Sequence, residues 1–188
     1  MVRRLVTIAF VATTGFTAFE ATFALLGQRR FGLGLAGTGL VFTFVGLAIA
    51  LFQGGFVHTV VTRLGEVSTV RLGLMVNVVG FALLAMATTW PLLVASLAAI
   101  TAGQGLLSPA LTALVAGWAG HERRGATLGL QQAASALARV AGPIAGGVVF
   151  EHVGVGAPSV VAVASAAGGL ILLPGVRSSP RSVTPGLD

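Results

Sequence analysis

The sequence contains no cysteine and no lysine, and only 9% of its residues are charged. The absence of cysteine excludes disulfides and thiolate chemistry and leaves the redox compartment open. An ordinary soluble domain has about a quarter of its residues charged. The shortage of charge, together with 55% hydrophobic residues and a mean hydropathy of +0.97, predicts a membrane protein.

The sequence also lacks the side-chain groupings that catalysis requires. Ser108 and Ser135 have no histidine on a plausible facing helix, because all three histidines lie near expected membrane edges. Glu20 has no second carboxylate at membrane depth, and no cluster of metal ligands occurs. We therefore expect no enzyme, no metal site and no cofactor.

Long apolar runs dominate the rest of the chain, and each is long enough for a helix to cross the hydrocarbon core. The connections are short, so neighbouring helices should be antiparallel. A polar tail at 175–188 is expected to be disordered, which leaves one transmembrane bundle at 1–174. The six expected spans are Leu5–Leu26, Leu35–Val61, Leu72–Thr89, Leu92–Trp118, Gly125–Phe150 and Ala157–Leu173.

All eleven basic residues are arginines, and their distribution predicts the orientation of the chain. With the amino terminus in the cytoplasm, eight arginines lie on that side, two lie outside and Arg139 lies within a span. This bias follows the positive-inside rule, so the basic charge indicates topology rather than a nucleic-acid partner. We expect an integral protein of the cytoplasmic (plasma) membrane with both termini in the cytoplasm and no cleavable signal peptide.

The fifth span carries a polar and small-residue stripe, which should face protein or water rather than lipid. Small residues let another helix approach closely, and Pro143 frees a backbone carbonyl and favours a bend. A plain helix-packing seam with a kink is the alternative. The residues that share this face are Gln132, Ser135, Arg139, Gly142 and Gly146.

Arg139 is a candidate functional residue because an ionised side chain near mid-membrane costs at least ~2.5–3.5 kcal/mol. Glu20 in the first span is the acidic residue expected at similar depth, so we expect the two to meet directly or through water. A purely structural ion pair is the alternative.

Two other spans carry polar stripes at helical spacing, Thr13, Thr17 and Glu20 in the first and Thr101, Gln104, Ser108 and Thr112 in the fourth. Such groups often bond only their own backbone or a neighbouring helix. Three stripes in one chain nevertheless predict a shared polar cavity. Its expected lining is Gln104, Ser108, Gln131 and Gln132, with Glu20 and Arg139 tuning or bracing it.

The segment "HERRGATLGLQQAASALARVAGPIAGGVVFEHVG" resembles the eleventh helix of Major Facilitator Superfamily transporters, in particular the drug:proton antiporter branch. It is similar to a pseudo-repeat of that branch's glycine motif, with Ala138 replacing one glycine. The matching residues are Gly129, Gly142, Pro143, Gly146 and Gly147. The loop "GGFVHTVVTRLGEVSTVRLG" is similar to a degenerate copy of the family's cytoplasmic loop motif, with Arg63 and Gly65 matching.

The resemblance covers the chain from about Leu5 to Leu173, as helices seven to twelve of a twelve-helix fold. It implies one bundle made of two inverted three-helix repeats and proton-coupled efflux of a drug or metabolite. The segment from Gly142 to Gly147 would then bend and pack against the opposite bundle.

The implied partners are membrane lipid, a small-molecule substrate, and either an amino-terminal half or a second copy of the chain. Because Met1 lies almost at the start of the first span, we expect no amino-terminal half within this chain. The alternatives are a truncated, non-transporting fragment and a membrane scaffold.

Overall fold

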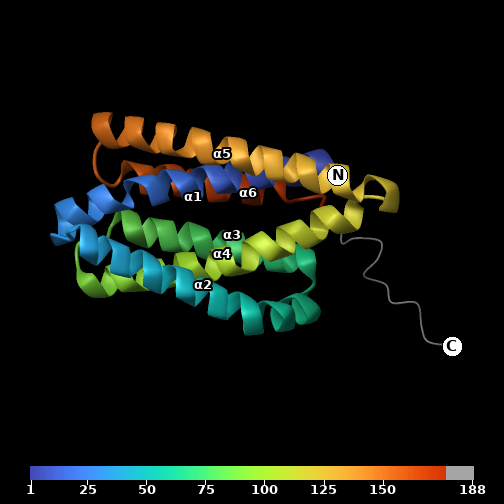
Figure 1. The fold of residues 1–188 in the computed structure, drawn as a ribbon, viewed down its shortest axis with the longest axis horizontal. Coiled ribbons are helices and arrows are strands. Elements are labelled where there is room, and N and C mark those ends of the chain that lie inside the picture. The colour runs from blue at the N-terminus through green and yellow to red at the C-terminus, as the bar shows by residue number, and fades with distance from the viewer. Residues whose placement is uncertain (177–188) are drawn as a thin grey trace.

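The structure, a computed structural model, describes residues 1–176, apart from the side chains of residues 52–58 and 121. Within this part of the chain all regular structure is helical, which confirms the all-α fold class (Figure 1). The helices are α1 (Val2–Phe31), α2 (Leu35–Leu64), α3 (Glu66–Ala85), α4 (Trp90–Trp118), the short η1 (His121–Arg123), α5 (Arg124–His152) and α6 (Ala157–Leu172).

Each expected span falls on one long helix, and α3 differs most from expectation. It begins at Glu66 instead of Leu72, because Gly65 adopts a φ of +78° and lets a new helix start at once. It ends at Ala85 instead of Thr89, which is extended before the first turn of α4. Of the tail predicted at 175–188, Gly175 and Val176 are described, and Val176 is buried in the apolar core. The rest, 177–188, lies outside the described residues.

Four helices, α1, α3, α4 and α5, are long and apolar enough to cross a membrane by length and composition. The apolar helix Ala157–Leu172, α6, is shorter. In α2 the fully described apolar stretch is Leu35–Leu51, within a helix of 30 residues. A helix of sixteen residues, such as α6, is about 24 Å long at 1.5 Å per residue, somewhat less than a ~30 Å hydrocarbon core.

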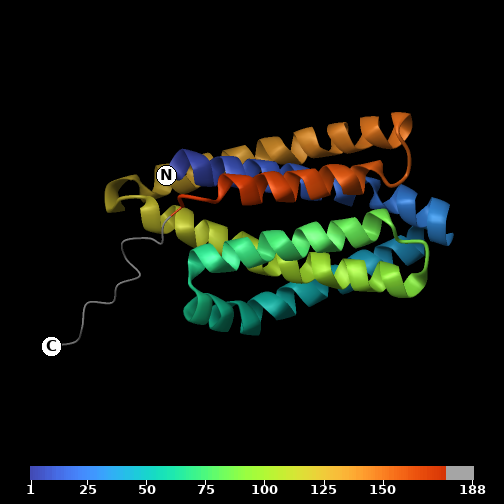
Figure 2. The ribbon, with the colours of Figure 1, turned by 180° about the vertical axis from the view of Figure 1, so that it is seen from behind.

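The helices form two layers that reflect a three-helix repeat. Figure 1 shows α1 and α4 in the middle of one face with α5 and α2 at its edges, and Figure 2 shows α3 and α6 on the opposite face. The first helix of each repeat packs on the second and third helices of the other: α1 on α5 and α6, and α4 on α2 and α3. Each repeat therefore packs its first helix into the other repeat, which is the arrangement of two inverted three-helix units.

Glycines set the closest helix approaches. A Cβ at Gly146 in α5 would lie 2.6 Å from the carbonyl oxygen of Ala18 in α1, and one at Gly142 would lie 2.7 Å from that of Thr14. The segment from Gly142 to Gly147 is predicted to pack against an opposite bundle, but Gly142 and Gly146 pack against α1 of the same bundle instead. A Cβ at Gly129 or Gly147 would have no neighbour within 4 Å among the described residues, so these two make no such contact here.

Two arginines fasten the ends of α1 to the carboxyl ends of other helices. Arg30 Nη1 donates at 3.0 Å to the carbonyl of Ala85, the last residue of α3, and at 3.0 Å to that of Ala87, just beyond it. Arg4 Nη1 donates to the carbonyl of Pro174, just beyond α6, at 2.8 Å. Cations are favourable at helix carboxyl ends, where carbonyls lack intrahelical partners.

Two apolar clusters close the bundle above and below its middle. One contains Leu5 and Ile8 of α1 with Leu114 of α4, and the other contains Phe23 of α1 with Phe81 of α3. Thr13 of α1 and Gln104 of α4 lie between these clusters along their helices. Glu20, Ser108 and Thr112 lie at the levels of the apolar residues themselves, on another face of each helix. The polar side chains therefore occupy the middle of the bundle and overlap the inner edges of both clusters.

Candidate functional site

A cavity of about 380 Å³ lies at this middle level, between α1, α4 and α5, with one residue from α2. This volume falls within the range of small-molecule pockets, roughly 300–1,000 Å³. All six residues expected to form a substrate path line it: Glu20, Gln104, Ser108, Gln131, Gln132 and Arg139. Their functional roles remain predictions.

Helical spacing explains why these side chains converge. Residues three and four apart share one helix face, so α1 presents Thr13, Thr17 and Glu20 to the cavity. On α4 the same spacing presents Gln104, Ser108 and Thr112. Thr101 belongs to the same sequence stripe, but it is buried and does not line the cavity.

The sequence did not predict the apolar part of the wall, whose larger side chains are Phe16, Ile49, Leu107 and Leu111. Phe16, Leu107 and Leu111 are three or four residues away from polar lining residues, so the spacing could have identified them. Ile49 carries no such signal, because α2 is uniformly apolar near it. Its place in the wall depends on how α2 packs against α4.

Gln131 is a buried polar residue of the cavity, with 6% of its surface exposed, the same as Thr17. Its Nε2 donates to Thr112 Oγ1 at 3.3 Å, and that hydroxyl donates to the carbonyl of Ser108 at 3.0 Å. Its Oε1 is buried and has no hydrogen-bond partner among the described residues. Buried polar atoms are rarely left unpaired, but this oxygen is enclosed by its neighbours, so the amide side chain has to move before a ligand can reach it.

Glu20 and Arg139 both line the cavity, and both side chains are exposed in the chain by itself. The expected direct contact is absent, because no ion pair of 4 Å or less occurs in the described part of the chain. Instead, α1 and α5 are joined beside them by Thr17, whose hydroxyl donates to the carbonyl of Ala138 at 3.2 Å. The two opposite charges share one cavity without being paired.

Pro143 lies inside α5, four residues after Arg139. Proline has no N–H, so the carbonyl of Arg139 lacks its usual intrahelical donor. The helix nevertheless continues through this point to His152. A free backbone acceptor therefore lies next to the guanidinium stem.

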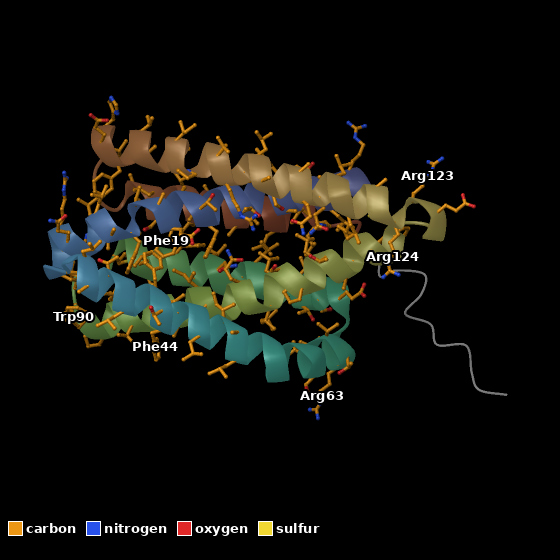
Figure 3. The ribbon with its side chains drawn as sticks, in the orientation of Figure 1. Phe19, Phe44, Arg63, Trp90, Arg123 and Arg124 are labelled. Atoms are coloured by element: carbon orange, nitrogen blue, oxygen red, sulfur yellow. The ribbon has the colours of Figure 1, made fainter. Side chains whose placement is uncertain are left out.

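The loop-motif residues lie away from the cavity. Gly65 ends α2 and begins α3, and its positive φ is a conformation that glycine adopts without strain. Arg63 points away from the bundle at the same end as Arg123 and Arg124 (Figure 3). Within the described residues, no group of three or more potential metal ligands occurs.

Known proteins resemble this chain over nearly its whole length. The model of the Major Facilitator Superfamily matches residues 5–187. The human Major facilitator superfamily domain-containing protein 10 is 29% identical over 148 residues, which are 79% of this chain and 32% of that protein. The class G tetracycline resistance protein of Vibrio anguillarum is 32% identical over 124 residues, 66% of this chain and 31% of that protein.

Solved transporter structures also resemble this chain. The crystal structure of the human organic anion transporter MFSD10 (TETRAN) has a TM-score of 0.84 at 27% identity and covers 92% of this chain and 40% of its own. A peptide transporter in complex with sulfate shares the fold, with a TM-score of 0.80 at 20% identity over 92% of this chain and 36% of its own. The chain thus spans well under half the length of these relatives.

Proposed function

Because this chain belongs to the Major Facilitator Superfamily, we propose that it forms one six-helix bundle of an efflux transporter. Because the chain belongs to this superfamily, it is an integral membrane protein of a transporter family rather than an enzyme. The observation that carries the proposal is the cavity at mid-bundle, lined by polar side chains from α1, α4 and α5. In this proposal the cavity is one wall of the path for a drug or metabolite, and a proton gradient drives export.

A second six-helix bundle supplies the other wall. The chain covers 32% of the human relative. On α5, Gly129 and Gly147 share one face, about 80° round the helix from Arg139, and a Cβ at either would have no described neighbour within 4 Å. We propose that this second bundle is either an amino-terminal half or a second copy of this chain. A truncated, non-transporting fragment or a scaffold is the alternative.

The arginines of the loops support a cytoplasmic position for the end of the bundle that carries Arg63, Arg123 and Arg124 (Figure 3). The absence of cysteine makes this testable with single cysteines. A membrane-impermeant maleimide should label Leu64→Cys and Gly120→Cys only in inside-out vesicles, and Val153→Cys only in intact cells. External labelling of Leu64→Cys would overturn the proposed orientation.

Efflux assays in vesicles test the proposed function. The chain held as a monomer should show no gradient-driven efflux of ethidium or tetracycline, because one bundle supplies one wall. Co-expression with an amino-terminal six-helix half, or assembly as a homodimer, should give saturable efflux that a protonophore abolishes.

Each outcome of this assay tests a different part of the proposed function. Saturable efflux by the monomer would contradict the two-bundle proposal. Efflux that persists with a protonophore would remove proton coupling and leave transport standing. No efflux with either kind of second bundle would favour the fragment or scaffold alternative. A cysteine at Gly147 that crosslinks between two copies would identify the homodimer.

A further inference from the structure

The cavity contains one acidic and one basic side chain that do not form an ion pair with each other. Among its described lining residues, Glu20 and Arg139 are the charged ones, and no ion pair of 4 Å or less joins them. The net charge of the wall is therefore zero, but the charges are separated. An ionised group at membrane depth is costly unless it finds a partner.

Neutral hydrogen-bonding groups of the same cavity also favour a polar ligand. Ser108 and Gln132 line the cavity and are exposed. Gln131 is different, because it is 6% exposed, its Nε2 donates to Thr112 and its Oε1 is buried. A hydroxyl and an amide can each donate and accept, so Ser108 and Gln132 suit either end of a dipolar ligand.

The net charge of the ligand follows from these observations. A ligand with only an anionic group could pair with Arg139, but it would leave Glu20 without a partner and would be repelled by it. A ligand with only a cationic group could pair with Glu20, but it would leave Arg139 without a partner and would be repelled by it. A dipolar ligand pairs with both charges and leaves the occupied site neutral, which is the cheapest state in a low-dielectric cavity.

We propose that the cavity binds a small dipolar organic ligand of net charge near zero, with its anionic group on Arg139 and its cationic group on Glu20. This rests on the proposed function, because the ligand would be the transported substrate. Phe16, Leu107 and Leu111 supply an apolar wall for the body of the ligand. Charge-assisted hydrogen bonds to the guanidinium and the carboxylate supply its orientation.

Three probes with the same phenyl body test the proposal: dipolar L-phenylalanine, anionic hydrocinnamate and cationic phenethylamine. Binding is measured as the probe-dependent rise in the unfolding temperature of the full 188-residue chain in lipid nanodiscs. L-phenylalanine should bind about tenfold more tightly than either single-charge probe. Equal affinity for the three probes, or no binding of any, overturns the proposal.

Charge-neutralising variants give a readout that misfolding cannot imitate. Glu20→Gln should switch the preference to hydrocinnamate, and Arg139→Gln should switch it to phenethylamine. Glu122→Gln and Arg123→Gln neutralise exposed charges in η1, outside the cavity, and should leave the order of the three probes unchanged. If Glu20 and Arg139 are instead a structural pair, each variant lowers the unfolding temperature without changing the order, and the proposal fails.

The efflux assay separates this failure from failure of the proposed function. Efflux of ethidium or tetracycline with no charge-dependent order among the three probes overturns the dipolar ligand and leaves transport standing. The expected order, with its two switches and without efflux in any assembly, overturns transport and leaves a dipolar binding site.

Discussion

Gly146→Leu should abolish folded protein in the membrane, whereas the same change at the next residue, Gly147→Leu, should leave the folded chain intact. A Cβ at Gly146 would lie 2.6 Å from the carbonyl oxygen and 3.0 Å from the Cα of Ala18. Both are backbone atoms of α1, so α1 and α5 would have to separate to admit a side chain. Overpacking usually costs about 1–3 kcal/mol for small insertions, and a leucine here should cost more.

Gly147 provides the control because a Cβ there has no described neighbour within 4 Å. Replacing a helical glycine with a good helix former should even gain about 0.5–1 kcal/mol. The measurement is the amount of monodisperse protein extracted from membranes, together with its unfolding temperature. Equal yields of the two variants would show that α1 and α5 do not meet at Gly146.

Gly147→Trp should reduce efflux by the assembled transporter more than about tenfold while leaving the folded yield of this chain unchanged. Gly147 lies eight residues after Arg139, which is about 80° round α5 from it, and a Cβ there has no described neighbour within 4 Å. A second bundle that completes the cavity has to approach this side. An indole at that point would hold the two bundles apart, because small residues are what permit close helix contact.

Val148→Trp is the matched control for this prediction. Val148 is 53% exposed and lies nine residues after Arg139, which places it on the opposite side of α5, facing lipid. Lipid should accommodate the indole, so efflux and assembly should stay within about twofold of the unchanged protein. Equal loss of efflux in both variants would mean that Gly147 is not at a bundle interface.

Several features were already determined by the sequence, because they depend on local chemistry. The low charge and long apolar runs predict a membrane protein, since a bilayer accepts only helices or barrels of apolar surface. The spacing of polar residues on three helices predicts a shared cavity, and the structure brings Glu20, Gln104 and Gln131 together in one. The resemblance of the glycine segment identifies the family.

Other features were decided only by tertiary structure, because they depend on how each helix is rotated against its neighbours. Helical spacing puts Gly146 on the small-residue stripe and Gly147 off it, but only the packing shows that α1 of the same bundle covers Gly146 and leaves Gly147 open. Thr101 and Gln104 belong to one stripe, but packing buries Thr101 away from the cavity. Similar depth suggested an ion pair between Glu20 and Arg139. The depth of a residue in the membrane follows from the rise per residue along its own helix. An ion pair also requires the two side chains to reach each other across the cavity. The width of the cavity depends on how the helices pack, which the sequence does not show.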